Sequence, residues 1–445
     1  MAILSENGAS EEPVLDKDRH IKYWTRCLKT LLPHQYTSND SNRLYLAFFI
    51  ISALDLLGVL KTVPSKEERE DHINWIYHCQ HPDGGFRMWP GTDFGVRASK
   101  DNAMWDPANI PATYFALASL LLLEDDFARV RRRGCLEWLP RMQRGDGSFG
   151  ETCVDGVVEG GMDPRFGYCA TGIRFILRGT MSGPLEIEGR SVRDIDVDSF
   201  VKCVQLAEAH DGGIADLGFH EPHAGYTFCS LGALAFIDRL DVGDHAHSKR
   251  PLATAPTNPS AVISWLAYRQ TELTDPDAGI DSEFTAPDET TDNDPSQKPG
   301  VDKIAKVQQK AETPAHQTAE HSVGISILDL LVDGAGMSGR TNKVADTCYG
   351  FWVGASLHLM KQPTLYDHAA MRRYLLGKTQ HPVLGGFGKF PGDLPDLLHG
   401  YLALAALGLS GCEGVKVLEG GMCLSREARE RLPPLWKRWG VHDGE

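Results

Sequence analysis

Asp83-Gly84-Gly85-Phe86 follows a helical pattern that runs from Trp75 to Gln80, and this punctuation returns along the 445-residue chain. Each copy consists of a helix, a glycine turn and an apolar residue. Glycine adopts positive φ at no steric cost, so the turn can end its helix and return the next apolar side chain to the core. The other copies are Asp146-Gly147-Ser148-Phe149, Asp211-Gly212-Gly213-Ile214 and Gly385-Gly386-Phe387.

Helical patterns recur in pairs between these turns, and few alternating runs predict strands. One helix pair cannot bury its own apolar face, so such repeats form a solenoid or a closed array. The sequence therefore predicts an all-α fold built from repeated helix pairs. We predict a helical domain over residues 19–410, a disordered lead-in over residues 1–18, and a peripheral C-terminal extension over residues 411–445.

Residues 271–322 interrupt the helical pattern. The segment is rich in Asp, Glu, Thr and Pro and has almost no large apolar residues, so burial cannot repay its ordering entropy. We predict a disordered acidic insert. A regulatory or tail-binding acidic loop is the functional alternative.

Composition excludes several classes of protein. A chain of this length with 42% hydrophobic residues can bury a large core. It has no run of about 18 apolar residues and its first 18 residues are polar, so we expect no stable membrane insertion and a cytoplasmic location. Ten unevenly spaced cysteines predict reduced thiols. The net charge of -15 argues against nonspecific nucleic-acid binding and is compatible with basic protein tails.

Two predicted helix starts place metal-binding side chain types on inward faces. Asp346 and Cys348 open one apolar helix, while Asp396 is a predicted N-cap for another that carries His399. Oxygen, sulfur and nitrogen ligands suit zinc, and three protein ligands leave a fourth position open, as in catalytic zinc sites. An Asp-x-Cys pair is short, however, and a cysteine at a helix start is often a small core residue.

A family resemblance adds to this pattern. It is carried by Arg340-Thr341-Asn342-Lys343-Val344-Ala345-Asp346-Thr347-Cys348-Tyr349-Gly350-Phe351-Trp352 and by Asp396-Leu397-Leu398-His399-Gly400-Tyr401. Together these stretches resemble the signature of protein prenyltransferase β subunits. Arg19-His20-Ile21-Lys22-Tyr23-Trp24 and Asn42-Arg43-Leu44-Tyr45-Leu46-Ala47-Phe48-Phe49 resemble the type I geranylgeranyltransferase (CaaX) β subunit in particular. The resemblance covers about residues 19–409 without the insert, and it implies an α/α toroid of six inner and six outer helices around a central funnel.

The resemblance also implies roles for individual residues. One zinc ion per β subunit would be bound by Asp346, Cys348 and His399. Cations and hydrogen-bond donors would bind the lipid diphosphate, and these interactions would strengthen as the diphosphate gains charge on leaving. By position, the diphosphate residues are His223, Arg340, Lys343, Tyr349 and Lys389; the isoprenoid pocket residues are Tyr45, Arg165, Tyr168, Tyr226, Cys229, Trp352 and Leu402; and the peptide-binding residues are Asn109, Phe166 and Leu398.

Two residues favour the geranylgeranyl type over the farnesyl type. Farnesyltransferases carry an aspartate that helps place magnesium where this chain has Lys389, and a tyrosine where it has Leu398. A lysine supplies positive charge directly, so Mg²⁺ is not required by this resemblance. Tyr45 and Leu402 match neither type and leave the tunnel length open. Asn109 and Pro111 replace the usual His and Ala near the last residue of the peptide.

The implied activity is transfer of geranylgeranyl from geranylgeranyl diphosphate to the cysteine of a C-terminal CaaX box, with X mostly leucine. Substrates would include Rho-type small GTPases, and a helical α subunit would complete a heterodimer. The alternatives are a farnesyltransferase β subunit, a terpene cyclase of the same toroid fold, and a noncatalytic binding toroid. Asp194-Ile195-Asp196-Val197-Asp198 superficially resembles a cyclase motif, although such a run also suits a helix cap.

Overall fold

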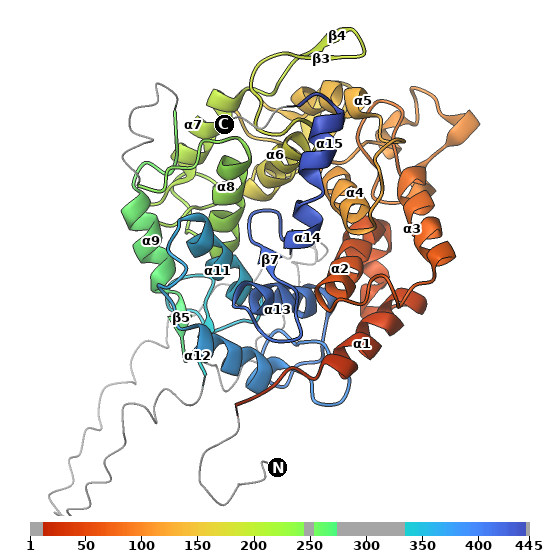
Figure 1. Ribbon diagram of the computed structural model, residues 1–445. Coiled ribbons are helices and arrows are strands. Elements are labelled where there is room, and N and C mark those ends of the chain that lie inside the picture. Colours follow the sequence, from red (N-terminus) through yellow and green to blue (C-terminus); the bar gives the residue numbers. More distant parts are fainter. Residues whose placement is uncertain (1–11, 244–252, 274–333, 442–445) are drawn as a thin grey trace, which may run out of the picture. The chain divides into compact units, whose positions relative to one another are not determined.

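Six apolar helices form an inner ring in the computed structural model, which describes residues 12–243, 253–273 and 334–441 (Figure 1). Each inner helix packs against the next, and the last packs against the first, which closes the ring. Their side chains are buried on nearly all sides because neighbours surround them. The inner helices are α2 (Arg43–Leu56), α4 (Ile110–Leu122), α6 (Pro164–Arg178), α8 (Ala224–Phe236), α11 (Tyr349–Leu359) and α13 (Leu397–Leu409).

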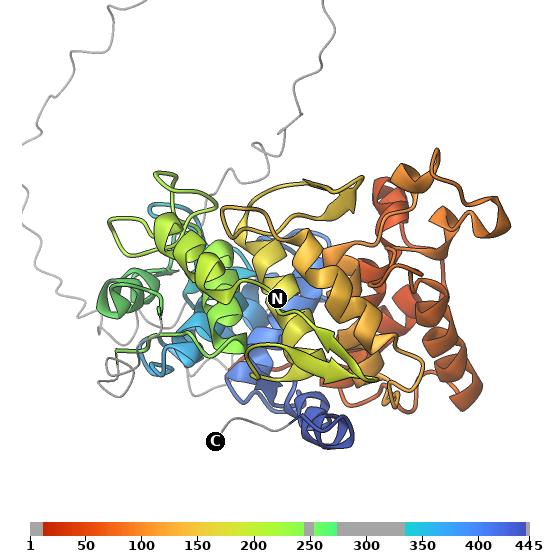
Figure 2. The same ribbon diagram turned by 90° about the horizontal axis from the view of Figure 1, so that it is seen from above.

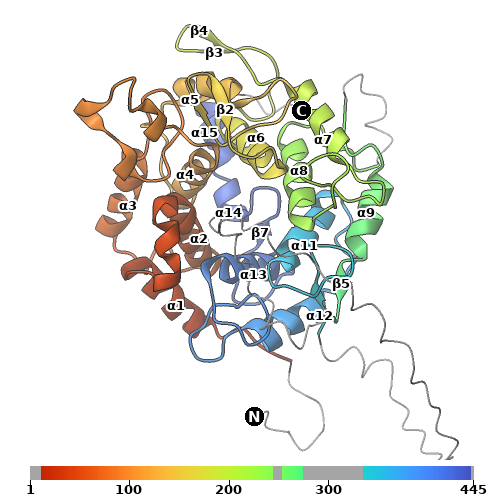
Figure 3. The same ribbon diagram turned by 180° about the vertical axis from the view of Figure 1, so that it is seen from behind.

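Six further helices of the described residues form an outer layer around this ring (Figures 1 and 3), and two more follow at the C-terminal end. An outer helix buries only one face; α1, for example, buries His20, Tyr23 and Trp24. The predicted α/α toroid with six inner and six outer helices is therefore confirmed. The outer helices are α1 (Lys17–Lys29), α3 (Lys66–His78), α5 (Arg132–Trp138), α7 (Val197–Ala207), α9 (Pro259–Ala267) and α12 (His368–Arg373), which continues into the π-helical segment η7 (Tyr374–Thr379).

Short elements connect these helices. Short 3-10 helices are η1 (His34–Asn42), η2 (Pro90–Thr92), η3 (Gly95–Arg97), η4 (Ala103–Trp105) and η5 (Leu139–Met142). Two antiparallel hairpins pair β1 (Thr152–Val154) with β2 (Val157–Glu159) and β3 (Leu185–Ile187) with β4 (Arg190–Val192). No helix among residues 12–243, 253–273 and 334–441 combines the length and hydropathy needed to cross a membrane.

The predicted helix, turn and plug repeat is confirmed at all four positions. Antiparallel bridges close the turns, and each apolar plug is at most 1% exposed. The bridged pairs are Gln80 with Phe86, Gln143 with Phe149, Glu208 with Ile214, and Gln380 with Phe387.

A fifth copy was not visible in the sequence. The strand β5 (Gln270–Thr271) pairs with β6 (Gly336–Met337), so Gln270 meets Met337 as Gln80 meets Phe86. The long segment between these strands therefore stands where the other repeats have a short turn. Residues 271–273 belong to the folded unit, while the predicted insert from residue 274 onward lies outside the described residues.

Turn glycines also let neighbouring repeats approach closely. Gly147 has φ +92°, and a Cβ atom there would lie 2.1 Å from the carbonyl oxygen of Ser199 on α7. A Cβ atom on Gly385 would likewise lie 2.5 Å from the carbonyl oxygen of Arg19 on α1. The last repeat therefore packs closely against the first. The glycine turn that follows one outer helix thus allows close packing against the next outer helix.

The Gly147→Ala substitution should lower the free energy of unfolding by roughly 2–4 kcal/mol, because it combines a left-handed backbone with a backbone clash. Gly156→Ala is the matched control: its φ is +79° but no atom lies within 4 Å of the added Cβ. The free energy of unfolding of that control should fall by only about 1–2 kcal/mol. Denaturant unfolding of the two variants measures the difference, and equal losses would contradict the close-packing role.

The segment after Ser410 is not peripheral, contrary to expectation. It forms the hairpin of β7 (Leu418–Glu419) and β8 (Leu424–Ser425), followed by α14 (Arg426–Arg429) and α15 (Leu432–Arg438). Figure 2 shows the C-terminal helices, in dark blue, at one end of the ring. Trp436 is 2% exposed, and its indole nitrogen donates to the carbonyl of Ile176 at 2.9 Å. Helix α1 begins at Lys17, inside the predicted lead-in of residues 1–18, while residues 1–11 lie outside the described part of the chain.

Candidate functional site

A cavity of about 690 Å³ opens where the inner helices begin. The first two turns of every inner helix contribute to its wall. Helix N-termini carry partial positive charge, so their convergence favours an anionic group at this end of the ring. One lining residue from each inner helix is, in order, Tyr45, Pro111, Arg165, Tyr226, Trp352 and Leu402.

The cavity wall is largely aromatic. The Tyr45 ring lies edge-on to Phe49 and Phe115, with centroids 4.4 and 5.4 Å away, and Phe228 lies 5.1 Å from Trp352. A concave surface of this kind suits a long hydrocarbon. All seven residues predicted for the isoprenoid pocket line it: Tyr45, Arg165, Tyr168, Tyr226, Cys229, Trp352 and Leu402.

Sequence reasoning missed other members of this wall. They are aromatic residues on helices that are apolar on all sides, so nothing in the periodicity separates them from ordinary core residues. A cysteine from the C-terminal hairpin also reaches the cavity. These missed residues are Phe48, Phe49, Tyr114, Phe115, Phe228, Tyr401 and Cys423.

Asp346, Cys348 and His399 come together beside this cavity, as the sequence predicted. One potential ligand atom from each lies within 4.8 Å of the others. Asp346 and Cys348 are buried, the His399 side chain is 12% exposed, and His399 Nε2 lies 3.4 Å from Asp346 Oδ1. Oxygen, sulfur and nitrogen donors thus converge in a nearly dry site, which fits a metal ion with a preference for this mixed set.

Asp396 orients the histidine of this cluster. As the predicted N-cap of α13, it accepts the backbone N–H of His399 at 2.9 Å through Oδ1. Its Oδ2 accepts from His399 Nδ1 at 2.6 Å, which directs Nε2 toward the cluster. Burial disfavours the charged imidazole, but hydrogen bonds to Asp346 and Asp396 outweigh burial and raise the pKa of His399 to about 9. A metal ion would therefore displace a proton when it binds.

The Asp396→Asn substitution should weaken metal binding about 10- to 100-fold, because it removes the carboxylate that orients His399. Asparagine is itself a good N-cap, so α13 should stay folded. Competition with a chelator of known affinity measures the change. Asp367→Asn is the matched control, since Asp367 caps α12 without contacting the cluster, and it should leave metal affinity unchanged.

Two of the predicted diphosphate residues are in direct contact. His223 is the N-cap of α8; its Nδ1 accepts from Gly225 N, and its Nε2 lies 3.0 Å from Tyr349 Oη. The neutral ring must therefore carry its proton on Nε2 and donate it to Tyr349. Burial, then the charges of Arg340 and Arg165, lower the pKa of His223. The imidazole is thus a neutral directed donor.

The predicted cations lie outside the cavity wall. Arg340 pairs with Glu221 at 3.1 Å, and the side chains of Lys343 and Lys389 are exposed. The Lys389 carbonyl accepts from Thr347 N at 3.1 Å, which fixes this lysine next to the Asp346 and Cys348 segment.

The predicted peptide residues divide into two groups. Phe166 and Leu398 line the cavity, but Asn109 does not. Asn109 instead caps α4 by accepting from Ala112 N at 2.9 Å, and its Nδ2 donates to Glu151 at 2.9 Å. Glu151 itself lines the cavity, so Asn109 holds a residue of the cavity wall in place through this hydrogen bond.

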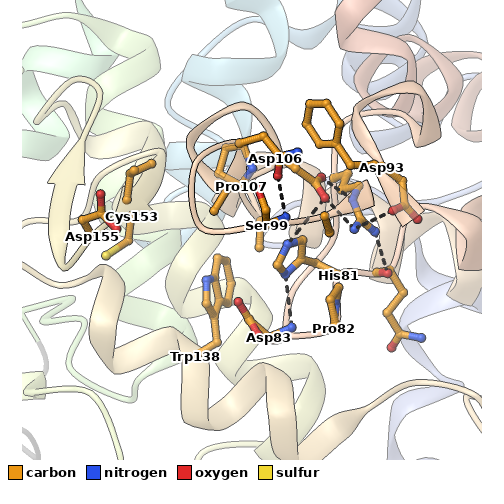
Figure 4. Close-up of a pocket in the computed structure, with 18 of the residues that line it drawn as sticks. His81, Pro82, Asp83, Asp93, Ser99, Asp106, Pro107, Trp138, Cys153 and Asp155 are labelled. Carbon is orange, nitrogen blue, oxygen red and sulfur yellow. Dashed lines mark hydrogen bonds and ion pairs between the residues drawn. The ribbon is translucent and has the colours of Figure 1, made fainter. Parts of the chain in front are cut away.

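A second cleft of about 820 Å³ lies between the segment before α4 and the β1–β2 hairpin (Figure 4). Its wall includes a buried ion pair between Arg87 and Asp106, with Nη2 and Oδ2 2.9 Å apart. His81 lies beside Asp106 at 4.0 Å. None of the predicted site residues lines this cleft.

The acidic run from Asp194 to Asp198 has a structural role. Asp196 is the N-cap of α7 and accepts from Ser199 N at 2.9 Å. Asp194 pairs with the buried Arg174 and Arg178, at 2.7 and 3.2 Å. The run therefore gives no support to the cyclase alternative.

Comparison with known proteins agrees with this geometry. The chain is 27% identical to the geranylgeranyl transferase type-1 subunit beta of Arabidopsis thaliana, over 91% of the chain and 87% of that protein. It is 26% identical to the Dictyostelium discoideum protein of the same name, over 93% and 96%. It is 25% identical to the protein farnesyltransferase subunit beta of Schizosaccharomyces pombe, over 91% and 79%.

The fold is shared with a solved structure, the Candida albicans protein geranylgeranyltransferase-I complexed with GGPP. The TM-score is 0.69 at 23% identity, over 95% of this chain and 99% of that one. Residues 15–424 match the prenyltransferase alpha-alpha toroid domain. The chain therefore belongs to the prenyltransferase alpha-alpha toroid family.

Proposed function

We propose that this chain is the β subunit of a type I protein geranylgeranyltransferase. The observation that carries the proposal is the Asp346, Cys348 and His399 cluster at the edge of an aromatic cavity. Leu398, which precedes His399 in the sequence, lines that cavity. Trp352, one helical turn after Cys348, lines it as well. Two of the similar relatives carry the type I geranylgeranyl name, and Lys389 and Leu398 favour this type over the farnesyl alternative.

Zinc is the metal that we assign to the cluster, because the mixed oxygen, sulfur and nitrogen set suits it. When bound, zinc would lower the pKa of a substrate thiol and keep the thiolate nucleophilic. The protein's part is to hold the three ligands in place. Asp346 accepts from Cys348 N at 2.8 Å, and Asp396 fixes the His399 ring.

Transfer forms a bond between the substrate sulfur and C1 of the isoprenoid and breaks the bond between C1 and the diphosphate oxygen. The substrate thiol proton is lost to solvent beforehand, and the electron pair leaves with the diphosphate. Negative charge then grows on the leaving group, where Tyr349, whose hydroxyl oxygen accepts from His223, can donate a hydrogen bond. Arg340, Lys343 and Lys389 supply positive charge, so magnesium is not required.

The substrates that we assign are geranylgeranyl diphosphate and proteins with a C-terminal CaaX box, mostly ending in leucine, such as small GTPases of the Rho type. A prenyltransferase α subunit would complete the heterodimer. All ten cysteines lie within the described residues and none of them forms a disulfide, which suits the reducing cytoplasm.

A competition assay tests this function. The chain, co-expressed with its α partner, would receive geranylgeranyl and farnesyl diphosphate together with peptides ending in leucine or methionine, with zinc present and magnesium chelated. We expect geranylgeranyl transfer to the leucine peptide. Farnesyl transfer that needs magnesium would favour the farnesyltransferase alternative, and conversion of the diphosphate without a peptide would favour a cyclase.

A further inference from the structure

The loop between β7 and β8 lies across the centre of the helix ring (Figures 1 and 3) and contributes to the wall of the cavity; we call this part of the wall its inner end. Tyr168 Oη donates to the carbonyl of Gly421 at 2.8 Å, and Tyr114 Oη donates to that of Met422 at 2.7 Å. Tyr401 Oη donates to the next carbonyl, that of the following cysteine. Three successive carbonyls are thus held by tyrosines from α6, α4 and α13.

Cys423 is the residue of this loop that lines the cavity. It is 7% exposed, and its Sγ lies 3.3 Å from Tyr401 Oη. Its φ is +55°, a conformation that a non-glycine residue keeps only where its surroundings hold it. Burial raises the pKa of the thiol to about 12, so the side chain stays protonated and behaves as a small apolar group.

The backbone around Cys423 has little freedom to move. Besides the three tyrosine bonds, the Glu419 carboxylate accepts from Gly421 N at 3.2 Å and from Met422 N at 2.7 Å. A larger side chain at position 423 must therefore take its volume from the cavity, because the loop cannot retreat easily. A smaller one must enlarge the cavity.

We propose that Cys423 is a specificity-determining residue that sets how long an isoprenoid chain the cavity accepts. The inference rests on the proposed function. It assigns the limit on isoprenoid chain length to the hairpin of β7 and β8. A thiol is small, which leaves room for a long hydrocarbon at the inner end. The side chain contributes through volume and takes no part in bond making.

The Cys423→Phe variant of the αβ complex tests the proposal. The ratio of kcat/KM for the C20 diphosphate to that for the C15 diphosphate should fall about 10- to 200-fold, the range over which hydrophobic pockets discriminate by size. Calorimetric Kd values for the two diphosphates should shift in the same direction. Cys412→Phe is the matched control, because Cys412 is half-buried and does not line the cavity.

The Cys423→Gly variant gives the opposite test with a residue suited to positive φ. It should bind the C25 diphosphate more tightly than wild type does, while its unfolding temperature stays close to that of wild type. Unchanged Kd ratios in this variant would overturn the proposal, whether or not the phenylalanine variant folds. A wild-type complex that binds the lipids but transfers none would contradict the proposed function, and the Kd ratios would still decide the role of Cys423.

Discussion

Replacing Asp346, Cys348 or His399 by alanine should remove the bound metal and lower prenyl transfer by roughly 10³-fold or more. Each supplies one of the three donor atoms that lie within 4.8 Å of one another. A metal ion in such a site contributes several kcal/mol of charge stabilisation, so its loss carries a large kinetic cost. Metal content by mass spectrometry and single-turnover transfer in the αβ complex measure the two effects.

The control for these variants is Cys412→Ala, a cysteine away from the cluster, which should keep both metal and turnover. Each ligand variant should also keep its affinity for the lipid diphosphate, because the aromatic cavity is unchanged. Wild-type turnover in any one of the three would remove that residue from the ligand set. Loss of lipid binding together with metal would point to unfolding.

The second large effect is expected from Lys389→Asp. Without magnesium, this variant should lose about 10²- to 10³-fold in kcat, the usual cost of removing one preorganised group that stabilises transition-state charge. Added magnesium should restore much of the activity, since the new carboxylate can help hold the ion near the diphosphate. Rates measured over a magnesium titration, with zinc constant, test both statements.

Lys437→Asp provides the charge-matched control for this substitution. Lys437 is exposed on α15, so the variant changes net charge equally without touching the site. It should remain active in the presence of a magnesium chelator. A Lys389→Asp enzyme that is equally active with and without magnesium would contradict the role assigned to the lysine.

Much of the fold could be predicted because its rules are local. Each turn copy, such as Asp83 to Phe86, carries a glycine and an apolar plug within a few residues, and both signals survive in a single sequence. The fifth copy could not be recognised because its two halves, Gln270 and Met337, are separated by a long segment. Pairing across such a gap depends on tertiary structure and leaves no local pattern.

The candidate site divides in the same way. Asp346, Cys348 and Asp396 lie at helix starts, where capping and metal-binding chemistry leave a recognisable spacing. The cavity wall did not stand out, since Phe49 and Phe115 look like ordinary core residues. Cys423 was also missed, because its place at the inner end depends on hydrogen bonds between its loop and distant tyrosines. Tyr114 and Tyr168 are both more than 200 residues away in the sequence.

The most direct test is to remove and restore the metal during transfer. The αβ complex would be dialysed against a chelator, loaded with geranylgeranyl diphosphate and a peptide ending in Cys-a-a-Leu, and assayed before and after addition of one equivalent of zinc. We predict one zinc ion per chain, no transfer without it, and recovery of geranylgeranyl transfer to the peptide cysteine when it returns. Full transfer by the metal-free complex would contradict the assigned role of Asp346, Cys348 and His399.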